Sequence, residues 1–383
     1  MDETKKNSKI NNYLVNIKSN YILKQIFTNL KESKILEIIR YNKNIKNKLN
    51  KDINDYKKYL QIEIEIIPSE KKFGKLINIK KKYNSYFHIY YKGNKDETII
   101  KNINKIEKLE KIKIIIDYEV KTLSKLFKEC KRCIKIKFIK FNRKDIKYLD
   151  YIFCDCSSLT EIDLSNFKTI NVKDMSGMFM GCASLEEIDL SNFDTKNVKF
   201  MNEMFYGCVG LEELNLSNFN TSNVIDMSFM FYRCKSLEKL DLSNFDTHNV
   251  INMKEMFEEC DSLSEINLSS FNTSKVTDMS SLFKGCSSLE YIDVSNFNTK
   301  NVKSMKGMFN ECESLEELDL SNFNTNNVKN MSFMFSKCYS LVELDISNFE
   351  VSKATDIRYI FEECDSLKKL NCSNRLIKSQ YNN

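Results

Sequence analysis

Cysteine is the residue in this chain whose type and spacing most directly suggest chemistry. Among the 13 cysteines in 383 residues, nine recur every 26 residues, from Cys156 to Cys364, without an insertion. Regularly spaced thiols could form a disulfide framework, supply metal ligands, or act as small apolar side chains in a repeating core. The surrounding sequence decides between these three possibilities.

A disulfide framework is disfavoured by the symmetry of the spacing. Each regularly spaced cysteine would have two equivalent neighbours, and the total number of cysteines is odd. The first twenty residues contain no apolar run of signal-peptide length, and no stretch approaches the roughly 20 apolar residues of a membrane span. We therefore expect a cytoplasmic protein with no membrane span, whose thiols stay reduced.

A zinc site is the alternative raised by two short motifs, CKRC at Cys130–Cys133 and CDC at Cys154–Cys156. Two close pairs of thiolates could bind zinc tetrahedrally. The repeat phase places Cys130, Cys133 and Cys156 at inward positions, whereas Cys154 falls at a variable position that should face outward. This pattern favours core thiols, so we expect no metal and no cofactor.

Each 26-residue unit combines two hydrophobic periods. In the unit of Cys208, the first apolar residues are one, three or four positions apart, which predicts a short helix with one buried stripe. These residues are Val198, Met201, Met204, Phe205, Cys208 and Leu211. Leu214 and Leu216 then alternate with polar residues, as in a short strand. The predicted fold is an α/β repeat solenoid, in which stacked strands form a parallel sheet and each unit adds one short helix.

A ladder of asparagines is expected along this stack. Asparagine recurs once per unit at the turn after the strand, interrupted by Ser270, and its amide can satisfy the backbone of a neighbouring turn. The ladder consists of Asn166, Asn192, Asn218, Asn244, Asn296, Asn322, Asn348 and Asn374.

The repeats, particularly SLEELDLSNFNTNNVKNMSFMFSKC at Ser314–Cys338, closely resemble the BspA-like leucine-rich repeat family. The resemblance covers residues 124–374, about ten units. It implies a repeat solenoid used for protein binding or adhesion, without catalytic activity. Many family members are secreted or surface proteins, which makes a surface adhesin one alternative for this chain.

The amino-terminal part differs from the repeats. Apolar residues at helical spacings in Asn20–Asn50 weakly resemble an F-box, although the usual Leu-Pro is absent, and this resemblance implies a substrate adaptor of an SCF-type ubiquitin ligase as another alternative. Strands are expected at Leu60–Pro68, Ser85–Tyr91 and Lys111–Asp117, the last pairing with the first repeat. The predicted organisation is a helical, F-box-like segment (1–59), a strand-containing connector and cap (60–123), the repeat array (124–374) and a tail (375–383).

Charge divides the chain into two halves. Residues 1–150 hold 38 Lys and Arg against 18 Asp and Glu, a net +20, and the remainder holds 21 against 35, a net −14. No recognition motif accompanies the basic half, so nucleic-acid binding is not expected. In the acidic half the outward strand positions form an acidic face, interrupted by Lys239, Tyr291 and Lys369.

The sequence therefore predicts a protein that binds another protein through this acidic face, to which a basic partner would be suited. Enzymatic chemistry is not expected, because the histidines are only His88 and His248 and there is no Gly-rich phosphate-binding loop. Duplication of one acidic unit could also have produced the face without a function. The candidate partner-binding residues are Asp163, Glu187, Asp189, Glu213, Asp241, Tyr291, Asp293, Glu317, Asp319, Glu343 and Asp345.

Overall fold

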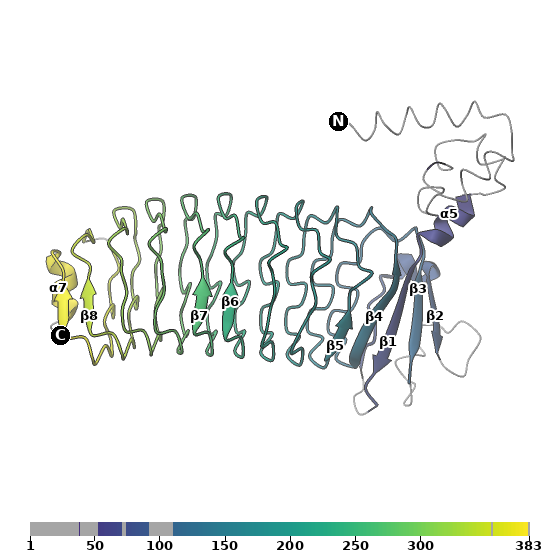
Figure 1. Cartoon of the computed structure of the whole chain (residues 1–383), viewed down its shortest axis with the longest axis horizontal. Coiled ribbons are helices and arrows are strands. Elements are labelled where there is room, and N and C mark those ends of the chain that lie inside the picture. The colour runs from purple at the N-terminus through teal and green to yellow at the C-terminus, as the bar shows by residue number, and fades with distance from the viewer. Residues whose placement is uncertain (1–37, 39–52, 71–73, 92–109, 354, 382–383) are drawn as a thin grey trace.

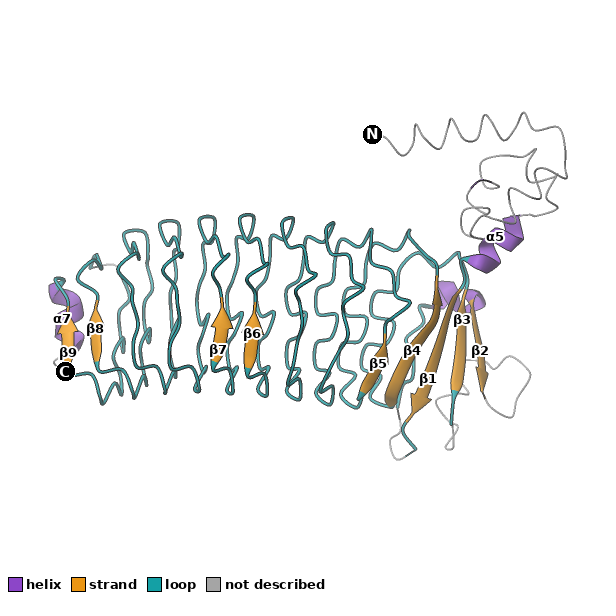
Figure 2. Cartoon of the chain, viewed as in Figure 1, coloured by secondary structure: helices purple, strands orange, loops and turns teal. Residues whose placement is uncertain are grey.

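A computed structural model describes residue 38 and residues 53–70, 74–91, 110–353 and 355–381. These residues form a small β-sheet followed by a long stack of 26-residue coils, with few regular helices and strands (Figures 1 and 2). The elements before the stack are α5 (Ile53–Tyr59), β1 (Ile62–Pro68), the 3-10 helix η1 (Lys81–Tyr86), β2 (Phe87–Tyr91), β3 (Ile112–Ile116) and β4 (Cys133–Phe141). Those within and after it are β5 (Glu161–Asp163), β6 (Lys239–Asp241), β7 (Glu265–Asn267), β8 (Glu343–Asp345), β9 (Lys369–Asn371) and α7 (Arg375–Tyr381).

The amino-terminal sheet has the strand order β2-β3-β1-β4-β5. Alternation in β1 buries Ile62, Ile64 and Ile66 and turns Glu63 and Glu65 outward, as a strand with one buried face requires. The three strands expected in residues 60–117 are thus confirmed. β4 is antiparallel to β1 on one side and parallel to β5 on the other, so it joins this sheet to the repeats.

The prediction that β3 pairs with the first repeat is wrong. β3 pairs with β1 and β2, and β4 pairs with the strand of the first repeat, where Ile136 lies opposite Ile162. The apolar pattern explains the outcome, because pairing Ile64 with both Ile114 and Phe138 places the buried side chains of three strands on one face of the sheet.

The coils stack through two parallel ladders. One ladder contains the short strands, including β6 with β7 and β8 with β9. The second ladder consists of bridges between equivalent residues of successive coils, from Tyr148 to Asp356. Between the two ladders lies the apolar core, so the outward residues of each ladder face different sides of the coil.

The short helix predicted in each coil is wrong, because between β4 and α7 the described residues contain turns instead. Two residues per coil adopt positive φ, for example Glu203 at 59° and Gly207 at 68°. Alternate N–H groups leave the coil and bond to the next one, as Phe205 N does to the Met230 carbonyl oxygen at 2.9 Å. An α-helix would direct these N–H groups four residues back within the same coil, so it cannot form here.

The buried side chains form columns along the stack. Rings from Phe127 to Phe361 stack in sequence, with centroids of neighbouring rings 5.5 to 6.1 Å apart. The regularly spaced cysteines form a parallel column of free thiols, all buried except the half-buried Cys364. The Cys208 thiol donates a hydrogen bond to the Phe179 carbonyl oxygen at 3.1 Å, and the other regularly spaced thiols repeat this contact. The thiols are therefore core groups, as predicted.

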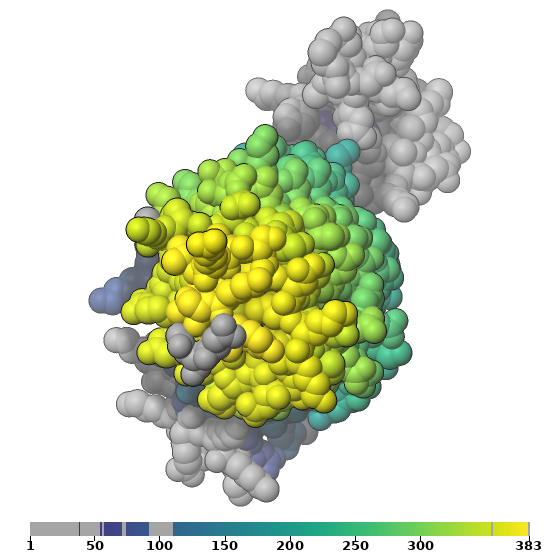
Figure 3. All heavy atoms as spheres, turned by 90° about the vertical axis from the view of Figure 1, so that its left-hand side faces the viewer, coloured from purple at the N-terminus to yellow at the C-terminus, as the bar shows by residue number. Residues whose placement is uncertain are grey.

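The carboxyl-terminal end of the stack is covered by α7, and Figure 3 views the stack from this end. Ile377 of α7 is fully buried, and the Tyr381 ring meets the Phe361 ring edge-on at 6.0 Å. The Tyr381 hydroxyl donates a hydrogen bond to the Leu367 carbonyl oxygen at 2.8 Å. α7 thereby shields the apolar surface that a further coil would otherwise cover.

Candidate functional site

The strand face is the surface formed by the two outward positions of each coil's strand, such as Glu213 and Asn215, which flank the buried Leu214. The structure places every predicted partner-binding residue on this face. All of them are exposed except the half-buried Asp163. The positions are thus brought together along one side of the stack, in the arrangement that the alternating pattern predicts.

The second position of the strand face has a structural role that the sequence did not reveal. Asp189 Oδ1 accepts a hydrogen bond from the Ser191 N–H at 2.9 Å, which closes a turn and lowers the pKa of Asp189. Asn215 makes the same contact with Ser217 at 3.0 Å. An amide can therefore replace the carboxylate without loss of the turn. The other aspartates that bond in this way are Asp163, Asp241, Asp293, Asp319 and Asp345.

Lysines neutralise part of the strand face. Lys239 Nζ lies 2.8 Å from Glu265 on the neighbouring strand, and Lys369 makes the equivalent pair with Glu343 at 2.8 Å. In the first coil, lysines of β4 pair with Glu161 and Asp163. The strand-face glutamates without an ion pair among the described residues are Glu187, Glu213 and Glu317. The strand face therefore keeps these three glutamates as unpaired charges, in addition to its exposed aspartates.

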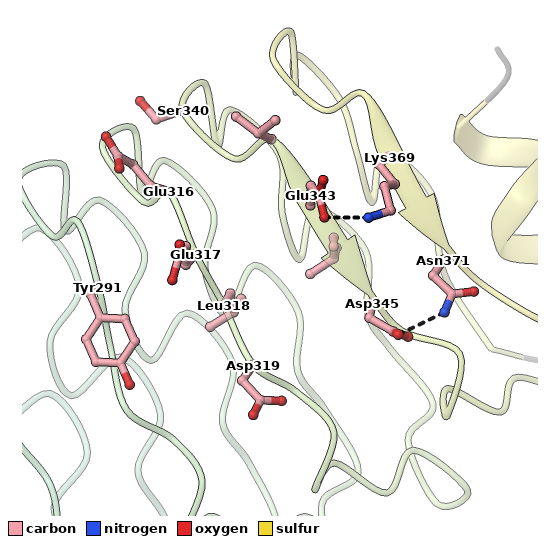
Figure 4. Close-up of a pocket in the computed structure, with 12 residues that line it drawn as sticks. Tyr291, Glu316, Glu317, Leu318, Asp319, Ser340, Glu343, Asp345, Lys369 and Asn371 are labelled. Carbon is pink, nitrogen blue, oxygen red and sulfur yellow. Dashed lines mark hydrogen bonds and ion pairs between the residues drawn. The ribbon is translucent and has the colours of Figure 1, made fainter.

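A shallow groove of about 800 Å³ crosses the carboxyl-terminal part of the strand face (Figure 4). Tyr291 is 60% exposed at one side, and Glu317 and Asp319 lie beside it. The Glu343–Lys369 pair borders the other side. An exposed aromatic ring next to carboxylates suits a cationic side chain, because the ring face and the carboxylates both attract positive charge.

Of the residues considered for zinc, Cys130, Cys133 and Cys156 lie near one another, but they do not form a metal site. Cys156 donates to the Phe127 carbonyl oxygen at 3.1 Å, and Cys133 donates to the Leu76 carbonyl oxygen at 3.4 Å. Cys154, expected to face outward, is buried at 1% exposure, because the preceding coil, whose Glu129 N–H bonds to the Cys154 carbonyl oxygen at 2.7 Å, packs beside it. Its thiol contacts Asp155 at 3.2 Å. Over the described ranges, no group of three or more His, Cys, Asp or Glu side chains is suited to hold a metal ion.

The cysteine thiols and the two histidines are the groups that could have served as nucleophile and base, and each has a different environment or partner in the structure. Burial raises the pKa of Cys208 and of Cys260 to about 12, so both thiols are poor nucleophiles near neutral pH. His248 is exposed on a turn, as predicted, and its Nδ1 lies 2.6 Å from Asp246 Oδ1. His88 lies 3.0 Å from Asp117 in the amino-terminal sheet.

Two polar ladders hold the coils together. The predicted asparagine ladder is confirmed: Asn192 Nδ2 donates to the Leu164 carbonyl oxygen of the preceding coil at 2.8 Å, and Ser270 replaces the amide with its hydroxyl. A buried threonine ladder was missed. Thr195 Oγ1 donates to the Asn220 carbonyl oxygen at 3.0 Å and accepts from the Asn220 N–H at 2.7 Å. Its signal in the sequence is a threonine at a fixed position of each coil from Thr169 to Thr325.

Models of the family described as "Mycoplasma protein of unknown function, DUF285" match residues 121–213, 186–267, 208–292 and 259–374. The chain belongs to this family. The DUF285 matches together span the repeats assigned above to the BspA-like pattern.

A crystal structure of a leucine-rich cell surface protein from Faecalibacterium prausnitzii A2-165 is similar to this DUF285 chain at 15% sequence identity and a TM-score of 0.29. The match covers 65% of this chain and 93% of that one. No curated protein matches the chain significantly.

The F-box-like segment Asn20–Asn50 lies outside the described residues, apart from Ile38, and the family match does not extend to it. Within the described ranges, no helix combines the length and the apolar character needed to cross a bilayer. The cytoplasmic location and the domain boundaries remain predictions.

Proposed function

We propose that this protein is a non-catalytic scaffold whose repeat solenoid binds a basic protein partner on the strand face. The observation that carries the proposal is the series of exposed carboxylates at Glu187, Glu213 and Glu317, which no lysine of the described chain neutralises. A cationic partner would supply the missing counter-charges. The groove beside Tyr291 would receive a cationic side chain in the same way.

The coil does not need net negative charge at the outward strand positions. Lysines already neutralise Asp163, Glu265 and Glu343, so neutral strand positions are compatible with the coil. The carboxylates that remain unpaired are therefore not required by the architecture. The proposal concerns the binding surface, and it applies equally to a partner inside the cell or at its surface.

The experiment uses the full chain and an oligolysine peptide as the probe. We expect binding that weakens as salt rises, because exposed charges are screened over roughly 8 Å at physiological ionic strength. The variant E187Q/E213Q/E317Q removes three exposed charges and should reduce the affinity several-fold. The matched control K173Q/K199Q/K303Q changes three exposed lysines away from the strand face. Equal binding by the wild type and E187Q/E213Q/E317Q would contradict the proposal.

A further inference from the structure

The second ladder of the coils presents a basic surface, which we call the ladder face. It consists of the outward residue next to each bridge position, for example Lys199 beside Phe200. Lys173, Lys199, Lys303 and Lys329 are all exposed, and no ion pair involves them in the part of the chain that the structure describes. Their backbones are fixed, since Lys199 N bonds to the Lys173 carbonyl oxygen at 2.9 Å.

The charges on the two faces correspond in most coils, with Glu265 and the uncharged Ile251 as an exception. The unpaired strand-face glutamates stand in the same coils as ladder-face lysines: Glu187 with Lys173, Glu213 with Lys199, and Glu317 with Lys303. Where the strand face carries a lysine, the ladder face of that coil carries no charge: Lys239 stands with Ile225, and Lys369 with Thr355. No coil among these presents a lysine on both faces.

The spacing of the charges selects the kind of partner. Successive coils are hydrogen-bonded as parallel strands, so equivalent residues recur about every 4.8 Å along the stack. Side chains on one side of an extended peptide recur about every 6.8 Å, and one turn of an α-helix rises about 5.4 Å. Either can bind through flexible side chains, but neither keeps one charge opposite each of several consecutive coils. A second copy of this chain has the same distance between successive coils, because its coils stack in the same way.

We propose that two copies of this chain associate side by side and parallel, with the strand face of one copy against the ladder face of the other. This proposal rests on the proposed function, since it names a second copy as a basic partner of the strand face. In the parallel orientation with coils in register, glutamates oppose lysines. In the reversed orientation about the same centre, Glu187 and Glu213 would still oppose lysines of other coils. Lys369 would oppose Lys147, however, and this like-charge contact, which the parallel orientation lacks, favours parallel copies.

The contact joins two different surfaces, so it leaves one face of each copy free. Association can therefore continue beyond a pair, and the expected product is a row of parallel copies. Because the opposed charges are exposed, the association should be strong at low salt and lost at high salt.

The test is sedimentation of the full chain at low and high salt, with charge-reversal variants. E187K/E213K should remain monomeric, because lysines would then oppose Lys173 and Lys199. E187K/E213K/K173E/K199E restores opposite charges in the same coils and should associate again. The control E187K/E213K/K303E/K329E has the same net charge but reverses lysines in other coils, and it should stay monomeric. Circular dichroism confirms that each variant is folded.

Three results would overturn the proposal: a wild-type chain that stays monomeric at low salt, failure of the same-coil swap to associate, or restoration by the other-coil control. The variant K173E/K199E separates this proposal from the proposed function. It leaves the strand face unchanged, so it should lose self-association and still bind the oligolysine peptide. Loss of peptide binding by E187Q/E213Q/E317Q, without any self-association by the wild type, would leave only the proposed function standing.

Discussion

The Sγ atom of Cys208 lies 3.1 Å from the carbonyl oxygen of Phe179, in the preceding coil. In every coil the phenylalanine carbonyl oxygen at this position also accepts a hydrogen bond from the backbone N–H of the cysteine three residues later. In the coil of Cys208, the Cys208 N–H donates to the Phe205 carbonyl oxygen at 3.1 Å. The thiol is therefore a buried donor as well as an apolar group, which explains the column better than either a disulfide or a metal site. A valine or an alanine at this position could not donate a hydrogen bond.

This burial predicts the order in which the thiols react with a maleimide in the native protein. Cys364, the half-buried member of the column, should react first, and the thiols from Cys182 to Cys338 should react only after unfolding. Cys154 should be protected as well, because it is 1% exposed. Mass spectrometry of the labelled peptides measures the order, and rapid native labelling of most of the column would contradict the fold.

The same thiols predict a loss of stability at alkaline pH. Burial raises the pKa of Cys208 and Cys260 to about 12, whereas the unfolded thiols ionise near pH 8.5. Above about pH 8.5 the unfolded chain loses protons that the folded chain keeps, so the free energy of unfolding falls as pH rises towards 12. The slope is up to about 1.4 kcal/mol per pH unit for each thiol. Urea unfolding at several pH values measures it, and C208A/C260A should show a shallower decline.

The turn at Asp189 predicts different effects for two substitutions. Asp189→Asn keeps an oxygen that can accept the Ser191 N–H, as Asn215 does for Ser217, so the free energy of unfolding should change little. Asp189→Ala removes the acceptor and should cost about 1 kcal/mol. Thermal unfolding of both variants provides the comparison. Equal destabilisation by Asn and Ala would show that charge, not the hydrogen bond, matters here.

The close approach of Gly177 and Tyr151 predicts that substitutions at these two residues have coupled effects on stability. Its φ is +55°, and a Cβ built on it would lie 2.3 Å from ring atoms of Tyr151 in the preceding coil. Other coils carry Glu203 or Phe229 with similar positive φ, so the backbone alone does not require glycine. Gly177→Ala should therefore destabilise the protein by about 1–3 kcal/mol through the clash. In a Tyr151→Ala background the same change should cost clearly less, and a double-mutant cycle in urea measures the difference.

Removing α7 should expose the apolar end of the stack. A chain ending at Asn374 lacks Ile377 and Tyr381, which cover Phe361 and the last coil. We expect a lower melting temperature and aggregation through the uncovered end. Light scattering and thermal unfolding test this prediction, with Arg375→Ala as the control because that side chain is exposed. A truncated chain as stable and monodisperse as the full chain would contradict a capping role.

The repeat period, the buried positions and the strand face could all be predicted from the sequence. Phe205, Cys208 and Leu211 recur without insertion, and alternation around Leu214 identifies the outward positions. The asparagine ladder was also predictable, because an amide at a turn has few other roles in a stacked repeat. These features depend on spacing alone, and spacing is fully visible in one sequence.

The turns could not be predicted, because their apolar residues have the same spacing as one face of a helix. What distinguishes them is positive φ at two positions per coil, and these positions hold Glu203, Phe229 and Arg233 as well as glycines. Such residues rarely adopt that conformation, so the sequence gives little sign of it. The pairing of β3 was missed for a similar reason: Lys111–Asp117 alternates like any strand, and alternation does not name the partner.

The hydrogen bonds between coils run along the axis of the stack, from each coil to the next. A force that pulls the two ends apart therefore acts on the boundary between one coil and its neighbour, and the remaining coils keep their own contacts. The coil at the end would detach first and release 26 residues. Fully extended, that length of chain spans roughly 90 Å. Under tension the molecule would lengthen in uniform steps, each set by one repeat of the sequence.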